Sequence, residues 1–243
     1  MHKSKTFFIS DLHLCQEQPQ ITKIFLDFLK TKATEADALY ILGDFFEVWI
    51  GDDDRNAFNQ MIIQALRAFT DTGIPTYFMH GNRDYLIGKR FAKASGVQLL
   101  KEPTVINLYG SPILLLHGDS LCTLDIKHQK ARKMMHNRFY QLITLSLPLK
   151  LRRHIAGRLR NTSKENKRQL ENHIMDVTPE EVLHVMREAK VKTLIHGHTH
   201  RPAIHNIKID NQNAQRIVLG AWHKQGNYLK IQADNTPDLV DFT

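Results

Sequence analysis

Seven side chains of types that bind metal ions follow five apolar segments of this 243-residue chain. The segments FFIS, ALYIL, TYFM, ILLL and TLIH have the pattern of buried strands, and each ends shortly before one or two of these side chains. The candidate ligands are Asp11, His13, Asp44, Asn82, His117, His198 and His200. Because the ends of neighbouring strands converge in α/β sheets, we expect these side chains to meet in one site.

The candidate ligands offer carboxylates, one carboxamide and imidazoles, but no thiolate. Such a set suits Mn²⁺, Fe²⁺, Co²⁺ or Zn²⁺ and argues against a closed structural zinc site. Seven donors are too many for one tetrahedral ion and fit two ions that share a carboxylate. Two ions about 3.5–4 Å apart activate water near neutral pH and neutralise phosphoryl charge. The set therefore predicts hydrolysis at phosphorus.

The spacing of the candidates also suits a shared site. Asp11 and His13 are two residues apart, so both point to the same side of an extended chain. Glycines next to the ligands let the backbone turn sharply, and these are Gly43, Gly81, Gly118 and Gly197. Each motif alone has an ordinary explanation, since Gly-Asp is usually a turn and Asn82 could cap a helix. All five in order at strand ends favour the metal site.

The chain resembles the calcineurin-like metallophosphoesterases in the motifs Asp11-x-His13, Gly43-Asp44, Gly81-Asn82-Arg83-Asp84, His117 and Gly197-His198-Thr199-His200. Within that family, FISDLHLC, YFMHGNRDYLIGKRFA, LLLHGDSLCT and LIHGHTHRPA are similar to the branch that hydrolyses UDP-2,3-diacylglucosamine. The resemblance covers nearly the whole chain. It implies attack at the α-phosphorus to give UMP and 2,3-diacylglucosamine 1-phosphate, a step of lipid A biosynthesis. The alternative is a metallophosphoesterase for nucleic acid or other small phosphoesters.

The resemblance implies roles for individual residues. One ion would be held by Asp11, His13, Asp44 and His200, and the other by Asp44, Asn82, His117 and His198. Mn²⁺ is the expected ion, although Co²⁺ and Fe²⁺ fit the same donors. The implied catalytic residues are Asp44, Asn82, Arg83 and His117. Many family members have histidine where this chain has Arg83, whose guanidinium stays protonated and is expected to stabilise phosphoryl charge.

The resemblance also implies a helical cap that receives the acyl chains. The implied substrate contacts are Asn82, Arg83, Asp125, Ser163, Lys167, Arg168 and His198. A further lysine of the family aligns with Leu170, so either Lys167 or Arg168 supplies that charge or the contact is lost. The implied architecture is a four-layer α/β/β/α sandwich, with a core of residues 1–123 and 190–243 and an inserted cap of residues 124–189.

The apolar pattern itself predicts the order of elements. Alternating strands and helices over residues 5–95 predict a parallel sheet, and later runs of strands predict antiparallel pairing. Strands are expected at 5–10, 37–43, 75–80, 97–100, 104–109, 112–117, 191–196, 202–209, 215–220, 227–232 and 239–242. The 97–117 strands read as hairpin-like. Helices are expected at 20–33, 56–72, 85–95 and within 124–189.

Basic charge is concentrated in residues 125–168, which hold thirteen Lys or Arg and two acids. Their net charge is +11 against +8 for the whole chain, so the other residues together carry −3. This segment could be a helix with a solvated basic face, a nucleic-acid site or an anionic membrane surface. Phe139 and Tyr140 are its only aromatic residues, which weakens the case for base stacking. We therefore expect a lipid partner and no nucleic acid.

Composition is consistent with one folded enzyme domain, with 42% hydrophobic residues. Cys15 and Cys122 give no disulfide framework and are expected to be buried in a reducing compartment. No signal peptide is visible, and no apolar segment approaches the ~20 residues of a membrane span. We expect a monomer bound peripherally to the cytoplasmic face of the inner membrane.

The remaining polar and aromatic candidates have structural interpretations. Asp52-Asp53-Asp54 lacks the oxygen spacing of a calcium loop and predicts a turn before a helix capped by Asp54 or Asn56. His80 is expected to pack beneath the site, and Asp119 to orient a ligand. Trp49 and Trp222 are expected to pack in the core or against the cap. His205 and His223 are expected to be peripheral, although the resemblance implies that the turn Gly220-Ala221-Trp222-His223 lies near the metal ions.

Overall fold

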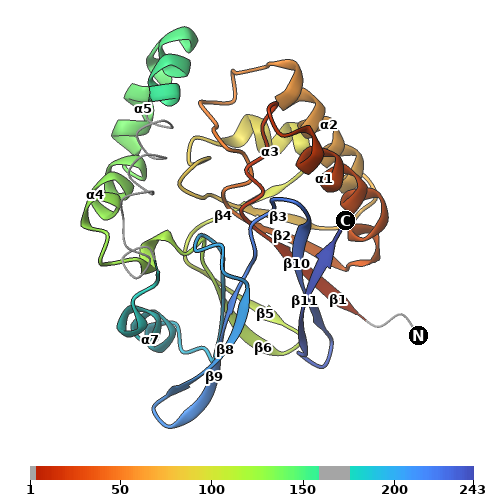
Figure 1. Cartoon of the computed structure of the whole chain (residues 1–243), viewed down its shortest axis with the longest axis vertical. Coiled ribbons are helices and arrows are strands. Elements are labelled where there is room, and N and C mark those ends of the chain that lie inside the picture. Colours follow the sequence, from red (N-terminus) through yellow and green to blue (C-terminus); the bar gives the residue numbers. More distant parts are fainter. Residues whose placement is uncertain (1–3, 159–175) are drawn as a thin grey trace.

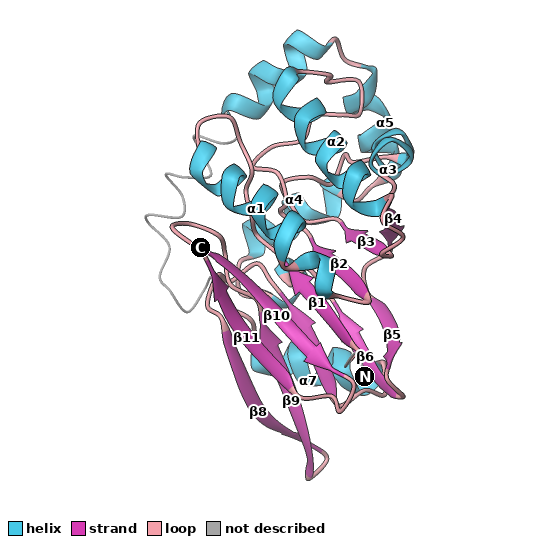
Figure 2. Cartoon of the chain, turned by 90° about the vertical axis from the view of Figure 1, so that its right-hand side faces the viewer, coloured by secondary structure: helices cyan, strands magenta, loops and turns pink. Residues whose placement is uncertain are grey.

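The computed structural model describes residues 4–158 and 176–243, and these residues form two sheets (Figures 1 and 2). The first sheet contains, in spatial order, β11 (Pro237–Phe242), β10 (Gly226–Gln232), β1 (Lys5–Ile9), β2 (Ala38–Leu42), β3 (Thr76–Met79) and β4 (Gln98–Leu100). The second contains β5 (Thr104–Leu108), β6 (Ser111–Leu115), β7 (Thr193–His196), β9 (Gln212–Val218) and β8 (Ala203–Ile209).

Helices cover the outer face of each sheet. The helices α1 (Pro19–Thr31), α2 (Ala57–Thr70) and α3 (Lys89–Ser95) pack on the first sheet, and α7 (Pro179–Glu188) packs on the second. Beside the α1–α3 layer stand α4 (Ile126–Met135) and α5 (Arg138–Ser146), as Figure 1 shows. Residues 149–158 are also helical. The predicted α/β/β/α sandwich is therefore confirmed.

Alternation along β1 shows why the two sheets stack. Phe7 joins the cluster under α1 and α2, whereas its neighbour Phe8 joins the cluster between the sheets. Phe8 stacks on Tyr40 of β2, with ring centroids 5.0 Å apart. Trp49 and Trp222 are buried in the first cluster, as predicted. The strand β1 is thus apolar on both faces over Phe7, Phe8 and Ile9, and polar residues follow where it ends.

The predicted parallel sheet is confirmed, because β1, β2, β3 and β4 pair in parallel. The hairpin prediction for residues 97–100 was wrong, since β4 extends the first sheet while β5 and β6 form the hairpin. The helix expected at 85–95 begins only at Lys89. The physical reason is Asp52, whose carboxylate accepts hydrogen bonds from the amides of Gly88, Arg90 and Phe91.

The acidic run of residues 52–54 has three separate structural roles. Asp52 caps α3, Asp53 pairs with Arg152, and Asp54 pairs with Arg153. Asn56 caps α2 by accepting a hydrogen bond from the Asn59 amide at 2.9 Å. The turn and the Asn56 cap were therefore predicted correctly.

Arg152 is expected to contribute more to stability than its neighbour Arg153. Arg152 is 4% exposed and donates to the carbonyls of Ile50 and Leu147, at 2.6 and 2.9 Å. Arg152→Met leaves the buried Ile50 carbonyl and the partly buried Leu147 carbonyl without this donor and should cost about 2–4 kcal/mol. The Arg153 side chain is 52% exposed, so Arg153→Met should cost less than about 1 kcal/mol. Urea unfolding measures both, and equal losses would contradict the assignment.

The cap segment, residues 124–189, is only partly described. The helices α4 and α5 have no buried residue, whereas Val182 and Met186 of α7 pack on the second sheet. Among the described residues, none of the helices has the length and apolar character needed to cross a bilayer. The predicted contacts Ser163, Lys167 and Arg168, and Leu170 at the position of the family lysine, lie outside the described residues. The division into core and cap stays a prediction.

Candidate metal centre

All seven predicted ligands lie in loops that follow β1, β2, β3, β6 and β7. Parallel pairing within each sheet brings these loops to the same edge of the sandwich. Backbone hydrogen bonds join the loops directly. The Asp11 amide donates to the Gly43 carbonyl at 3.1 Å, and the His13 amide donates to the main-chain carbonyl of Asp44 at 3.0 Å. The sequence therefore fixes the positions of the ligands through the strands before them.

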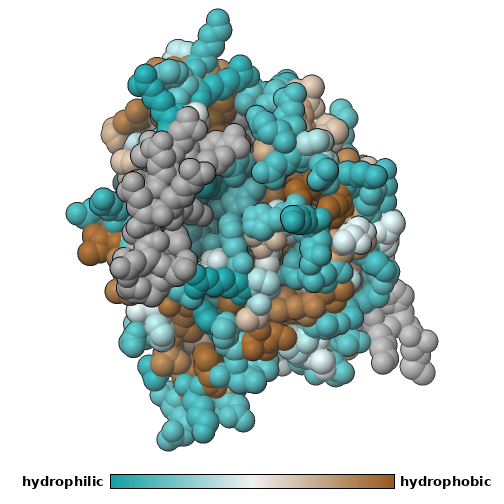
Figure 3. All heavy atoms as spheres, in the orientation of Figure 1, coloured by the Kyte–Doolittle hydropathy of each residue, from teal (hydrophilic) through white to brown (hydrophobic). Residues whose placement is uncertain are grey.

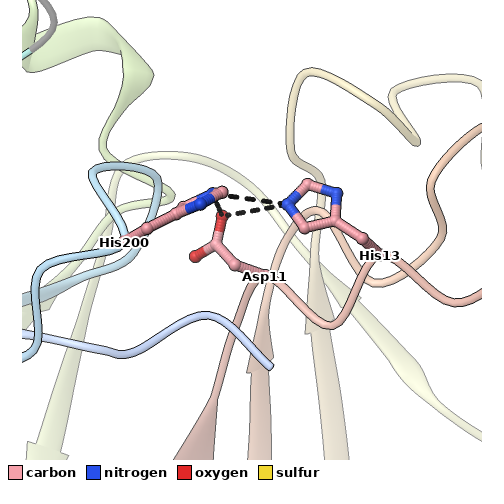
Figure 4. Close-up of side chains that lie close together, drawn as sticks. All are labelled: Asp11, His13 and His200. Carbon is pink, nitrogen blue, oxygen red and sulfur yellow. Dashed lines mark hydrogen bonds and ion pairs between the residues drawn. The ribbon is translucent and has the colours of Figure 1, made fainter. Parts of the chain in front are cut away.

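Asp11, His13 and His200 form the first cluster, with one ligand atom from each within 4.8 Å of the others. The His200 Nε2 lies 3.2 Å from Asp11 Oδ1 and 3.3 Å from His13 Nε2. Figure 4 shows both rings turned toward the Asp11 carboxylate. The loop after β7 thus reaches across to the loop after β1.

Asp44, His117 and His198 form the second cluster, in which one ligand atom from each residue again lies within 4.8 Å of the others. Asn82 joins it, because its Oδ1 lies 3.2 Å from His117 Nε2. Asp44 faces both clusters, with Oδ1 3.6 Å from His117 Nε2 and Oδ2 3.9 Å from His13 Nε2. This position is the one that a shared carboxylate requires.

Two buried groups test whether the site fits metal ions. Asp11 Oδ2 accepts hydrogen bonds from Ser10 Oγ and the His198 amide, whereas the buried Oδ1 faces only the imidazole nitrogens of its own cluster, with His200 Nε2 nearest at 3.2 Å in the described residues. The Nδ1 of His117 lies 2.9 Å from the Leu42 carbonyl, to which it can donate, so Nε2 is the ring nitrogen that faces the site and could bind an ion in place of a proton. A buried carboxylate oxygen that faces imidazole nitrogens and an imidazole oriented by a carbonyl both fit divalent cations.

The pKa shifts of the buried histidines and carboxylates also indicate a site that attracts cations. Burial disfavours a charged His117, but Asp44 and Asp11 outweigh it and raise the pKa of His117 to about 10. Burial also disfavours a charged Asp11, but His200, His117 and His13 hold its pKa far below the usual range. The buried carboxylates therefore attract positive charge strongly, and metal ions are one source of it.

Backbone strain is concentrated at the ligands. Five of the seven, all within the described residues, have positive φ values between 49° and 68°, and they are Asp11, His13, Asp44, His198 and His200. Non-glycine residues rarely adopt this conformation, and it persists where the surroundings impose it, often at functional sites. The hydrogen bonds between loops supply that constraint here.

A Cβ on Gly81 would lie 2.3 Å from both the amide nitrogen and Oδ1 of Asp44. Gly81→Ala should therefore displace Asp44 and lower turnover by about 100-fold, since errors near 1 Å have that effect. Gly157→Ala is the control, because a Cβ there meets nothing within 4 Å. Steady-state kinetics on both variants checks this. Equal activities would mean that Gly81 is not needed to place Asp44.

Comparison with known proteins identifies the family. A family model described as calcineurin-like phosphoesterase matches residues 4–202. The chain belongs to the calcineurin-like phosphoesterase family. A relative from Coxiella burnetii (strain Dugway 5J108-111), named UDP-2,3-diacylglucosamine hydrolase, is 56% identical over 98% of this chain and 97% of its own. One from Escherichia coli O7:K1 with the same name is 51% identical over 98% of both chains.

A solved structure supports the fold of this phosphoesterase. Vacuolar Protein Sorting 29 from Cryptosporidium parvum superposes with a TM-score of 0.50 at 13% identity. The match covers 98% of this chain and 96% of that one. At this identity the likeness concerns the fold alone.

Two supporting residues of the phosphoesterase centre, Glu47 and Asp84, were not predicted as such. Glu47 Oε2 lies 3.2 Å from His13 Nδ1, the arrangement that orients a metal-binding imidazole. Asp84 accepts hydrogen bonds from the amides of Gly81 and Phe45, and so joins the loops after β2 and β3. Glu47 is the one charge in the run FFEVW, a signal that could have identified it.

Other predicted positions have more ordinary roles. Asn82 does not cap a helix, because α3 begins at Lys89. His80 Nε2 lies 2.7 Å from the Ile87 carbonyl and so joins the two ends of the loop between β3 and α3. Asp125 caps α4 by accepting from the His128 amide at 2.9 Å.

His223 is exposed, and its ring centroid lies 6.0 Å from that of His200, so it stands at the edge of the first cluster. Its neighbour Trp222 donates its amide to the Asp11 carbonyl at 3.1 Å. The turn at residues 220–223 therefore packs against the first cluster. His205 lies on β8 and is exposed. Cys15 and Cys122 are buried, as predicted.

Proposed function

We propose that this chain hydrolyses UDP-2,3-diacylglucosamine at the α-phosphorus, releasing UMP and 2,3-diacylglucosamine 1-phosphate. The main structural support is the pair of Asp/His clusters, both of which the Asp44 carboxylate faces. Relatives that are 51–56% identical over 98% of the chain bear the name of this activity. Asp11, His13 and His200 would hold one ion and Asn82, His117 and His198 the other. When bound, two divalent ions, Mn²⁺ as the first choice, supply Lewis acidity beside the phosphoryl group.

The protein residues bind and orient the diphosphate. Arg83 is held by its main chain, whose amide donates to Asp44 Oδ1 at 2.8 Å. Its Nε is buried and has no hydrogen-bond partner in the described residues, which suits a guanidinium that binds phosphoryl oxygens. A phosphate leaving group depends little on protonation, so Arg83 can stand where many family members have an acid catalyst. Asn82 and His198 would also contact the substrate.

The cap segment supplies the lipid side of the proposal. Exposed apolar side chains form what we call the cap surface, made of Leu124, Ile126, Met134, Phe139, Leu142, Ile143, Leu145, Leu151 and Ile155. Phe139 is 72% and Leu142 67% exposed, which is unusual for large apolar residues. Apolar atoms appear among hydrophilic ones on the α4–α5 side in Figure 3. We propose that this surface receives acyl chains, with Asp125, Ser163, Lys167 and Arg168 near the sugar and phosphates.

We also propose that the cap surface docks peripherally on an anionic membrane. Apolar side chains insert at the interface, and neighbouring Lys and Arg attract anionic headgroups. Replacing Phe139 and Leu142 together by serine should weaken binding to phosphatidylglycerol vesicles about tenfold or more. Met61→Ser is the control, because Met61 is 40% exposed on α2. Vesicle sedimentation at two salt concentrations measures this. Unchanged binding of the double variant, or indifference to salt, would contradict it.

The reaction is tested with manganese-loaded protein and UDP-2,3-diacylglucosamine in ¹⁸O-labelled water. We expect UMP to be released and to carry the label. Label in the lipid phosphate would mean attack at the other phosphorus. Hydrolysis of oligonucleotides without hydrolysis of the UDP-lipid would overturn the proposal in favour of a nucleic-acid phosphoesterase.

A further inference from the structure

Arg132 of α4 lies between two buried carboxylates from the core. Its Nη2 is 2.7 Å from Glu102 Oε2, and its Nε is 3.0 Å from Asp119 Oδ1. The side chains of Glu102 and Asp119 are 6% and 1% exposed, and that of Arg132 is 21% exposed. Two carboxylates at this depth repel each other, and the planar guanidinium can pair with both at once. We call this triplet the Arg132 bridge.

The Arg132 bridge is connected to the second cluster at two points. Glu102 Oε1 accepts a hydrogen bond from the His117 amide at 2.8 Å. On the other side, the His128 ring stacks on His198, with centroids 5.4 Å apart and planes 26° apart. His128 Nε2 also lies 3.7 Å from Asp119 Oδ2. One helix therefore contacts the supports of both imidazoles in the second cluster.

The first cluster is supported differently. His13 is oriented by Glu47, and Asp11 is fixed by Ser10 and the His198 amide. These contacts come from the loops after β1, β2 and β7 rather than from α4. A shift of α4 should thus disturb the second cluster more than the first.

We propose that Arg132 is a positioning residue that makes affinity for the second ion depend on the placement of α4. The bridge fixes α4 against Glu102 and Asp119, and through them it fixes His117 and His198. Asp125, the N-cap of α4, is a proposed substrate contact in the lipid-binding cap. Substrate binding and second-ion binding would therefore influence each other through this helix. This inference rests on the two-ion centre of the proposed function.

The test compares Arg132→Met with Lys133→Met, its exposed neighbour on the same helix. Mn²⁺ binding is measured by titration calorimetry, and each step is assigned by anomalous scattering from crystals at graded Mn²⁺. Arg132→Met should weaken binding at the second cluster by about 10–100-fold and leave the first within about threefold, as expected for lost support around a ligand. Its turnover should recover at saturating Mn²⁺. Lys133→Met should match the wild type.

The outcomes separate the inference from the proposed function. If the wild type binds fewer than two ions, the two-ion centre fails. If the wild type binds two ions and Arg132→Met binds the second with unchanged affinity, only the present inference fails. If Arg132 is only structural, Arg132→Met should lower the melting temperature without changing the affinity for either Mn²⁺ ion. That result would also contradict the inference.

Should Arg132→Met not fold, Glu102→Gln serves instead. Glutamine keeps an acceptor for the His117 amide but removes the charge paired with Arg132. Weaker binding at the second cluster alone is again expected. An unchanged second affinity in Glu102→Gln would contradict the inference.

Discussion

Asp44→Ala is expected to lower kcat/KM for the lipid diphosphate by about 10³-fold or more, because losing even one electrostatic partner in an active site costs ~10²–10³-fold. Asp44 is the carboxylate that faces both clusters, and it accepts a hydrogen bond from the Arg83 amide. Its loss removes a ligand from each proposed ion at once. Metal analysis after dialysis should therefore show that ion content falls together with turnover.

Asp71→Ala is the matched control for Asp44→Ala. Asp71 ends α2, and its side chain is 57% exposed in a pair with Arg67. Its replacement should leave both activity and ion content unchanged. An Asp44→Ala protein that keeps two ions and a tenth of its turnover would show that Asp44 is not the shared ligand.

Arg83→Met should lower kcat by about 10²–10³-fold while leaving ion content unchanged. The variant keeps the main-chain amide that donates to Asp44, so it removes only the guanidinium. If that guanidinium stabilises charge as the phosphoryl group is transferred, kcat should fall more than KM rises. Steady-state kinetics in mixed micelles, with parallel metal analysis, separates these effects.

Arg90→Met is the control, since Arg90 is exposed in the first turn of α3. Arg83→His gives the most informative comparison. If that variant is faster than the wild type, the reaction needs a proton donor at this position, and the proposed role of Arg83 is wrong. If it is slower, the permanent charge of the guanidinium matters.

The metal ligands could be predicted because their positions depend on local sequence. An apolar run followed by glycine and a polar residue marks the end of a buried strand, as at Leu42-Gly43-Asp44. Parallel pairing then places these ends at one edge, whatever the details of packing. The Asn56 cap is also local, since its partner Asn59 is three residues away.

Contacts between distant segments could not be predicted in this way. The Arg132 bridge joins Glu102 and Asp119 to a helix whose basic pattern suggested only surface charge. The start of α3 depends on Asp52, which is 36 residues before Gly88. Neither arrangement leaves a periodic signal in the sequence, because tertiary contacts override local propensity.

The most direct measurement is anomalous scattering from crystals of this protein soaked in Mn²⁺. We expect two peaks, one among Asp11, His13 and His200 and the other among Asn82, His117 and His198. Asp44 should contact both. A single peak, peaks at other positions, or none at full soaking would contradict the two-ion centre on which the proposed hydrolysis depends.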